Sequence, residues 1–354
     1  MTRLFALAPV ILTALILGNA HAQGSFAGRT RFDLDRVEIR EFVESTARAT
    51  GMEPLDVYRL LAKAEPQPKI IELITRPAEK VSPWYEYRKN FLTEQRIAEG
   101  ASFMVEHRAR LEQAQRETGV APEYVVAIIG VETYYGRITG KYRVLDALAT
   151  LAFDYPPRAE YFKGELAQFI TLAREENLDP LTALGSYAGA MGAGQFMPSS
   201  YRRYAVDGGR DRQRNLFADW DDIIASVANY FKQHGWQAGG PVLADAVLQP
   251  DAPVVADPGN LSLNETIAGL RAKGVDFDDA KLPEQTRVLL VPAEQPAGPT
   301  YRVGFKNFEV ITRYNRSVRY AMAVHDLATH IAQRVDERDT AAKFGGKPAG
   351  TSAR

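Results

Sequence analysis

Hydrophobic positions recur at helical spacing through the first third of the chain. Apolar residues three and four positions apart mark one face of an amphipathic helix, and such faces need other helices to cover them. Pro66 and Pro68 interrupt the pattern, as proline does at helix ends. We therefore expect an all-α N-terminal domain over residues 23–118, with helices at 34–43, 54–64, 69–75 and 98–118.

The middle of the chain, residues 119–240, continues the helical pattern with longer apolar runs. The most apolar run is 125–136, which starts after Pro122 and ends at Gly136. Proline suits the first turn of a helix and glycine suits its end. We expect this buried helix and further helices at 144–153, 158–177 and 220–234.

The pattern changes at Gly239, where Gly-Gly-Pro signals a turn and short apolar runs replace the helical spacing. We expect a small α+β insertion over 241–300, with a helix at 261–274. The chain then returns to the core over 301–335, and the polar residues 336–354 are expected to be disordered. The fold class is mainly α (α+β). The expected strands are 287–291 and 300–308, and the last helix is 318–335.

The first 22 residues have the pattern of a secretory signal peptide. Arg3 precedes an apolar run from Leu4 to Leu17, and Asn19-Ala20-His21-Ala22 offers small residues for cleavage. The run is shorter than the ~20 residues that a spanning helix needs. No cysteine follows it, so we expect a mature protein that is soluble and is not a lipoprotein.

Composition excludes several classes of function. The net charge is −1 and no basic patch is interleaved with aromatics, which argues against binding to nucleic acid. The absence of cysteine excludes disulfides, thiolate metal sites and a cysteine nucleophile. The five histidines lie in no HExxH or GxSxG setting.

Glu132 is the one acid in the apolar helix at 125–136. Burial disfavours the charged form of a carboxyl and raises its pKa, which is the condition that a general acid needs near neutral pH. The alternative is a structural charge pair between Glu132 and Arg137 or Lys141.

A glycine-rich stretch at 185–201 is the second candidate site. Four glycines within ten residues allow a ligand to approach the backbone closely, or small residues to pack helices tightly. A phosphate loop is disfavoured, because no Gly-Lys-Ser/Thr follows a strand. Ser186 and Gln195 are the polar side chains that could meet a substrate hydroxyl or amide there.

Two further patterns stay open. Tyrosines in the helical parts suit the walls of a sugar groove but are also ordinary core residues. Asp207 and Asp211 occupy the first and fifth positions of a calcium loop, whereas Gly209, Arg212 and Ala218 depart from its pattern. Calcium at Asp207, Asp211 and Asp219 is therefore a low-ranked prediction.

From about Trp84 to His325 the chain resembles the lytic murein transglycosylase B family, which are glycoside-cleaving enzymes of bacterial cell walls with a lysozyme-like core. The motifs that carry the resemblance are Ile129-Gly130-Val131-Glu132-Thr133, the 145–151 segment, Arg158-Ala159-Glu160-Tyr161-Phe162, the 185–192 and 194–201 segments, 226–230, and Ile311-Thr312-Arg313-Tyr314-Asn315. The resemblance implies that Glu132 is the single catalytic acid and base. It also implies a glycan groove lined by Tyr87, Arg158, Tyr161, Ser186, Gln195, Phe196, Tyr230, Tyr314 and Asn315.

The resemblance further implies a periplasmic enzyme that cleaves the MurNAc-β-1,4-GlcNAc bond of peptidoglycan without water and leaves 1,6-anhydromuramyl ends. No cofactor is required in that case, calcium stays open, and proteins of cell-wall synthesis or the divisome are candidate partners. One alternative is a hydrolytic muramidase that uses Asp146 or Asp154 as a second carboxylate. A second alternative is a peptidoglycan-binding protein without catalysis.

Overall fold

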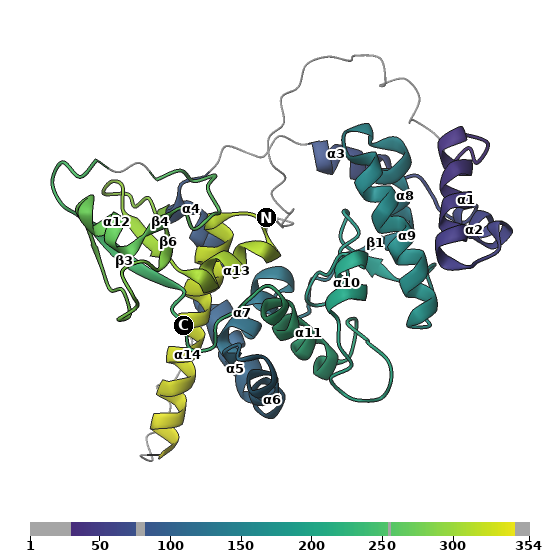
Figure 1. Cartoon of the computed structure of the whole chain (residues 1–354). Coiled ribbons are helices and arrows are strands. Elements are labelled where there is room, and N and C mark those ends of the chain that lie inside the picture. The colour runs from purple at the N-terminus through teal and green to yellow at the C-terminus, as the bar shows by residue number, and fades with distance from the viewer. Residues whose placement is uncertain (1–29, 76–81, 254–255, 344–354) are drawn as a thin grey trace, which may run out of the picture. The chain divides into compact units, whose positions relative to one another are not determined.

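A computed structural model describes residues 30–75, 82–253 and 256–343 of the chain (Figure 1). The chain divides into two compact units, and each is built from two separate segments. Unit 1 comprises Met1–Glu79 and Gly136–Ile223, and unit 2 comprises Lys80–Tyr135 and Ile224–Arg354. This division differs from the domain boundaries that the sequence predicts at residues 118 and 240; those boundaries remain predictions. The expected signal peptide at 1–22 lies outside the described residues.

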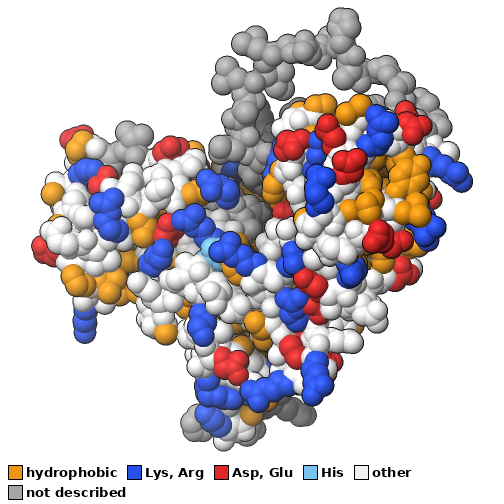
Figure 2. Space-filling view, turned by 45° about the vertical axis from the view of Figure 1, so that its right-hand side comes forward, with side chains coloured by type: hydrophobic (Ala, Val, Ile, Leu, Met, Phe, Trp, Pro, Cys, Tyr) orange, Lys and Arg blue, Asp and Glu red, His pale blue; other side chains and the backbone are white. Residues whose placement is uncertain are grey.

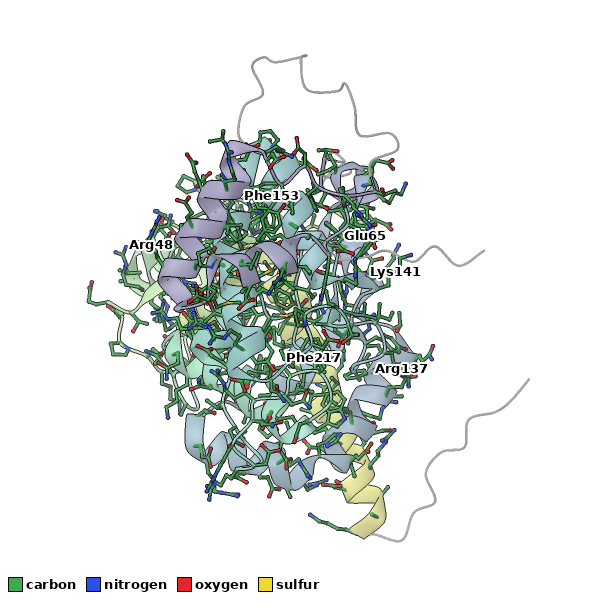
Figure 3. All side chains as sticks on the ribbon, turned by 90° about the vertical axis from the view of Figure 1, so that its right-hand side faces the viewer. Arg48, Glu65, Arg137, Lys141, Phe153 and Phe217 are labelled. Carbon is green, nitrogen blue, oxygen red and sulfur yellow. The ribbon has the colours of Figure 1, made fainter. Side chains whose placement is uncertain are left out.

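Unit 1 is built around α8 (Val144–Asp154), all of whose residues are buried. The helix packs against α9 (Ala159–Glu175), and its last apolar residue is Phe153, which Figure 3 labels. The ring of Phe153 lies edge-on to that of Phe42 of α1 (Val37–Thr50), with ring centroids 5.5 Å apart. The unit also contains α2 (Pro54–Leu61), α3 (Pro68–Thr75), α10 (Pro198–Tyr204), the short helix Pro156–Arg158, and a two-stranded sheet of β1 (Tyr142–Arg143) and β2 (Leu184–Gly185).

Unit 2 has α7 (Pro122–Thr133) near its centre, where it packs against α14 (Val318–Lys343) and α5 (Glu94–Glu106). Nine of the twelve residues of α7 are buried, which explains why its hydrophobic pattern runs around the whole helix. The other helical elements are α4 (Trp84–Tyr87), the short helix η1 (Arg88–Asn90), α6 (Arg108–Thr118), α13 (Lys306–Tyr314) and most of α11 (Trp220–Gln233), which begins in unit 1.

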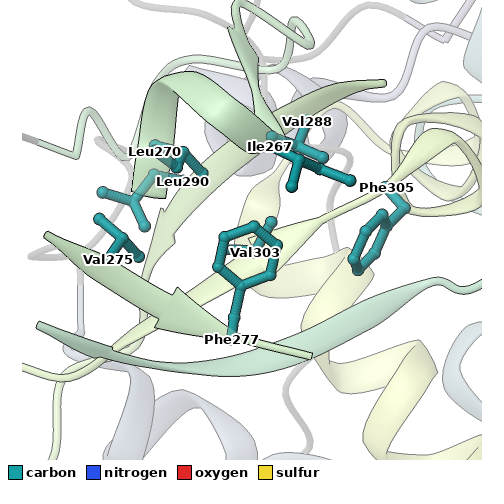
Figure 4. Close-up of a cluster of buried hydrophobic side chains, with 8 residues drawn as sticks. All are labelled: Ile267, Leu270, Val275, Phe277, Val288, Leu290, Val303 and Phe305. Carbon is teal, nitrogen blue, oxygen red and sulfur yellow. The ribbon is translucent and has the colours of Figure 1, made fainter. Parts of the chain in front are cut away.

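An antiparallel sheet with the strand order β4-β6-β7-β3-β5 also belongs to unit 2. Leu290 pairs with Val303, and both side chains join a buried apolar cluster under α12 (Ile267–Ala272) with Phe277 and Phe305 (Figure 4). This cluster gives the insertion a core of its own. The strands are β3 (Leu243–Leu248), β4 (Glu265–Thr266), β5 (Val275–Phe277), β6 (Arg287–Pro292) and β7 (Tyr301–Gly304).

The mainly α fold class with a small sheet is confirmed, and four details of the prediction were wrong. The helix expected at 98–118 is two helices, because the chain turns at His107, whose buried ring packs on Phe103. The strand expected at 300–308 ends at Gly304, and α13 follows it. Of the helix expected at 261–274, only Ile267–Ala272 is helical. The last helix continues to Lys343, so 336–343 is ordered; residues 344–354 lie outside the described part.

Charges of both signs are interspersed on the face of the molecule shown in Figure 2, as a net charge of −1 leads one to expect. Within the described residues, no helix has both the length and the apolar composition that crossing a membrane takes.

Candidate active site

Glu132 lies at the end of the buried helix α7, one residue before its last position. Tyr134 and Tyr135 follow in left-handed conformations, with φ of 53° and 59°, which end the helix and turn the chain. Bulky residues rarely adopt this conformation, and such strain concentrates at functional sites. Gly130 permits the turn, because a Cβ there would lie 2.7 Å from the ring of Tyr135. The Gly-Val-Glu motif thus places the acid beside a tight aromatic cap.

The carboxyl of Glu132 is crowded by protein and has one hydroxyl partner. Burial raises its pKa from 4.5 to about 7, and the Tyr320 hydroxyl, which donates to Glu132 Oε1 at 2.6 Å, opposes that rise. Tyr320 belongs to α14 and is itself buried. A hydroxyl donor stabilises the charged form of a carboxyl, whereas burial favours the neutral form. The balance leaves Glu132 able to release and regain a proton near neutral pH.

The structural charge pair proposed for Glu132 is not what sets its proton affinity. Neither Arg137 nor Lys141 contributes to the shift of its pKa, whose causes are burial and the Tyr320 hydroxyl. The two acids considered as a second carboxylate are engaged elsewhere. Asp146 accepts from Arg143 at 2.7 Å. Asp154 pairs with Arg36 at 2.8 Å.

Several groove residues expected in unit 2 gather with Glu132. Burial raises the pKa of the Tyr87 hydroxyl to about 12 and raises that of the Tyr314 hydroxyl; the charge of Glu132 adds to both rises, so both lie within its electrostatic reach. The ring of Tyr230 packs 4.8 Å from that of Tyr314, and its hydroxyl donates to a backbone carbonyl. The side-chain oxygen of Asn315 is buried, with no hydrogen-bond partner among the described residues. A buried acceptor of this kind is suited to a ligand donor.

The glycine-rich stretch of unit 1 forms a tight loop that holds its own polar side chains. Ser186 Oγ accepts from the backbone N–H of Ala190 at 3.0 Å, and Gln195 Nε2 donates to the carbonyls of Thr139 and Gly192, each at 3.0 Å. Phe196 is 3 % exposed and belongs to the core of the loop. Ser186 and Gln195 therefore shape this loop, whatever else they contact.

Arg158 and Tyr161 form a separate pair in unit 1. The Arg158 guanidinium lies 4.2 Å from the centroid of the Tyr161 ring, and Tyr161 is 42 % exposed. An exposed aromatic ring backed by a cation offers a flat apolar face, which is what a sugar ring stacks on.

The acids proposed for calcium do not form a metal-binding group. Within the part of the chain that the structure describes, no three His, Cys, Asp or Glu side chains gather in a metal-binding arrangement. Asp207 accepts from the backbone N–H groups of Asp211 and Arg212, and Asp219 accepts from that of Asp221. The loop is instead closed by the buried Asp222, which accepts from three backbone N–H groups at 2.6–3.2 Å. The three acids thus do not fit the predicted calcium ligand set.

Sequence reasoning missed Tyr320, the hydrogen-bond donor to Glu132. The two residues are 188 positions apart, and Tyr320 lies in an apolar stretch where a tyrosine is an ordinary core residue. The one available signal is a hydroxyl among buried aliphatic neighbours, because a buried hydroxyl needs a partner.

Comparison with known proteins assigns the family. The family model described as Transglycosylase SLT domain matches residues 35–329. The chain is 41% identical over 304 residues to "Membrane-bound lytic murein transglycosylase B" of Escherichia coli strain K12, which covers 83% of this chain and 82% of that protein.

Solved structures of similar proteins agree with this family assignment. The catenated lytic transglycosylase SltB1 of Pseudomonas aeruginosa has a TM-score of 0.81 and 45% identity, over 85% of this chain and 98% of that one. Slt35 of Escherichia coli, solved in complex with calcium, has a TM-score of 0.78 and 39% identity, over 87% of this chain and 97% of that one. SltB3 of Pseudomonas aeruginosa, solved with NAG-NAM-pentapeptide, has a TM-score of 0.72 and 27% identity, over 88% of each chain. The chain therefore belongs to the Transglycosylase SLT domain family, as a lytic transglycosylase with a lysozyme-like, mainly α-helical fold.

Proposed function

We propose that this enzyme cleaves the MurNAc-β-1,4-GlcNAc bond of peptidoglycan without water and forms a 1,6-anhydromuramyl end. The observation that carries the proposal is the chemistry of Glu132: one crowded carboxyl with a pKa of about 7, which among the described residues is bound by a single hydroxyl and by no cation. Glycosidases that use water ordinarily need two carboxyl groups. A single carboxyl is sufficient if it serves first as acid and then as base.

The proposed reaction begins with neutral Glu132, which donates its proton to the glycosidic oxygen as the bond from C1 of the muramyl sugar breaks. Positive charge develops at C1, where the N-acetyl group of the same sugar can stabilise it. The Glu132 carboxylate then takes the proton of the C6 hydroxyl, and that oxygen bonds to C1. Because the nucleophile belongs to the same sugar, its effective concentration is high, and no water is consumed.

Tyr320 supports the second half of this cycle. Once Glu132 has given its proton away, the carboxylate is left in a crowded setting where a charge is costly. The Tyr320 hydroxyl, 2.6 Å from Oε1, stabilises that charge until the carboxylate is reprotonated. Tyr320 is thus a positioning residue that acts through Glu132.

The glycan groove is proposed to use Tyr87, Tyr230, Tyr314 and Asn315 beside Glu132. The buried, unpaired Asn315 oxygen and the tyrosine rings support this assignment. Arg158, Tyr161, Ser186, Gln195 and Phe196 are proposed from their motifs, with the stacked Arg158–Tyr161 pair as the best physical support.

The periplasm is the proposed compartment, supported by the signal-peptide pattern of residues 1–22. The substrate is proposed to be a peptidoglycan strand, which the SltB3 complex with NAG-NAM-pentapeptide supports. Proteins of cell-wall synthesis or the divisome remain proposed partners. Calcium binding is supported by the Slt35 complex and is disfavoured by the arrangement of the acids in this loop.

The test uses purified peptidoglycan and the isosteric variant Glu132→Gln. The wild-type enzyme should clear the suspension, whereas the variant should still bind the glycan but release no product. A non-catalytic binding protein would bind without clearing in both forms. Arg116→Gln, which changes an exposed arginine of α6, is the matched control and should clear normally.

A further inference from the structure

A concave site lies in unit 2, and none of the groove residues named above lines it. It has a volume of about 930 Å³, at the upper end of the range of roughly 300–1,000 Å³ for small-ligand pockets. Its walls are α4 with η1, the start of α5, the second half of α14, and the loop at 295–296. We refer to it as the α4–α14 cleft; its lining includes Tyr85, Arg88, Gln295, His330 and Gln333.

The acids of the cleft are already paired with its other cations. Lys89 binds Glu86 at 2.8 Å. Arg334 binds Glu94 at 2.6 Å and lies 3.5 Å from Glu337. The three glutamates of the lining are therefore paired with Lys89 and Arg334. One further arginine in the lining is left outside these pairs.

Arg88 is that arginine. Its guanidinium lies 5.9 Å from the centroid of the Trp84 ring, and within the described ranges it has no carboxylate partner. An arginine fork without a partner, on the wall of a cavity, is suited to a carboxylate, which it can bind through two parallel hydrogen bonds.

Other polar groups in the lining are also available to a ligand. The Tyr85 hydroxyl, the His330 ring and the amides of Gln295 and Gln333 make no side-chain hydrogen bond with the described residues. Amide side chains both donate and accept, so they match the N–H and C=O groups of a peptide backbone. Leu92, Ile97 and Pro296 add apolar wall. A cleft with one free cation, peptide-like amides and apolar patches is suited to a short anionic peptide better than to an uncharged sugar.

The cleft adjoins the catalytic residue through one short helix. Tyr85 and Tyr87 both belong to α4: Tyr85 lines the cleft, whereas the ring of Tyr87 packs 5.6 Å from the guanidinium of Arg319, which is next in sequence to the Glu132 partner Tyr320. In peptidoglycan, the muramyl sugar whose bond is cleaved carries a peptide with carboxylate groups on its lactyl ether. A strand held at Glu132 therefore presents an anionic peptide beside the helix that forms the cleft wall.

We infer that the α4–α14 cleft binds the peptide of the peptidoglycan strand, with Arg88 pairing with one of its carboxylates. This inference rests on the proposed function, because it assigns a second binding element to the same substrate. The residues that support it are Arg88 for the carboxylate and Gln295 and Gln333 for the peptide backbone.

The experiment compares two substrates: glycan strands that carry their peptides, and the same strands after an amidase has removed the peptides. The full-length enzyme and its variants are assayed on both, and the ratio of kcat/KM for the first to the second is measured. Arg88→Gln should lower this ratio by about tenfold or more, the effect of losing a hydrogen bond to a charged group. Gln333→Ala, at an exposed position of α14, should lower it by a few fold. Arg116→Gln should leave it unchanged.

The inference is overturned if Arg88→Gln and Gln333→Ala reduce both rates by the same factor, or change neither, because the peptide then makes no contact with the cleft. If Arg88→Gln does not fold, the Gln333→Ala ratio decides. Failure of the proposed function gives a different result: the wild-type enzyme would then release no product from either substrate, or would release reducing ends in place of 1,6-anhydromuramyl ends.

Discussion

Replacing Tyr320 with phenylalanine removes one hydroxyl and should make Glu132 hold its proton more tightly. The Tyr320 hydroxyl donates to Glu132 Oε1 at 2.6 Å, which is the short distance of a charge-assisted O–H···O⁻ bond. This bond favours the carboxylate, so its loss must raise the pKa of Glu132 above about 7.

The size of the shift follows from the strength of the bond. A hydrogen bond to a charged group contributes about 1.5–3 kcal/mol. Since one pKa unit corresponds to about 1.4 kcal/mol, the pKa of Glu132 should rise by about one to two units. The mechanism needs neutral Glu132 in its first step, so kcat/KM falls as pH rises through this pKa.

The assay is the pH profile of kcat/KM on peptidoglycan strands. In Tyr320→Phe the high-pH limb of the profile should shift to higher pH by about one to two units. The plateau value of kcat/KM should be lower, because Glu132 is then a weaker acid. Tyr230→Phe is the control: its hydroxyl donates to the Arg313 carbonyl, so the limb should stay in place. A limb that stays fixed or moves downward in Tyr320→Phe would refute the coupling between this hydroxyl and the proton of Glu132.

Three further predictions concern stability. The folded-state pKa of Glu132 lies above its ordinary value of 4.5, so the free energy of unfolding falls as pH rises from about 4.5 to 7; Glu132→Gln should therefore raise this free energy at pH 8 by up to about 3 kcal/mol, seen as a higher Tm, and should not raise it at pH 4. Asp222→Ala leaves three backbone N–H groups without their acceptor and should lower the free energy of unfolding by about 3 kcal/mol or more, with or without calcium. An unchanged Tm in thermal unfolding would contradict the claim that Asp222 closes this loop. Gly192 has φ of 68°, and a Cβ there would lie 2.1 Å from the Leu216 carbonyl, so Gly192→Ala should lower Tm and loosen the loop, whereas exposed Gly164→Ala should not lower it.

The sequence was most informative where local chemistry decides the structure. The apolar run that forms α7, with Pro122 at its first position, predicted the helix and the raised pKa of Glu132. The glycines of 185–194 predicted a close approach to the backbone, by a ligand or by packed small residues; at Gly192 it is the Leu216 backbone that comes close.

The features that the sequence did not predict depend on contacts between distant segments. The helical spacing of 98–118 is continuous, yet the chain turns at His107, where the ring of Phe103 stacks on that of Tyr135 from another segment. Strand β3 has the sequence Leu-Ala-Asp-Ala-Val-Leu, with few of the β-branched residues that signal a strand, and it forms because β7 and β5 pair with it. The partner of Glu132 lies 188 residues away, so no local pattern could identify it.

The central claim is that one carboxyl both gives and takes the proton while the substrate's own C6 hydroxyl closes on C1. Mass spectrometry of the products from purified peptidoglycan tests it most directly, because an anhydro end is lighter than a reducing end by one water. The account predicts anhydromuramyl ends and, in water enriched in ¹⁸O, no uptake of the label. Reducing muramyl ends that carry ¹⁸O would show that water is the nucleophile and would contradict the account.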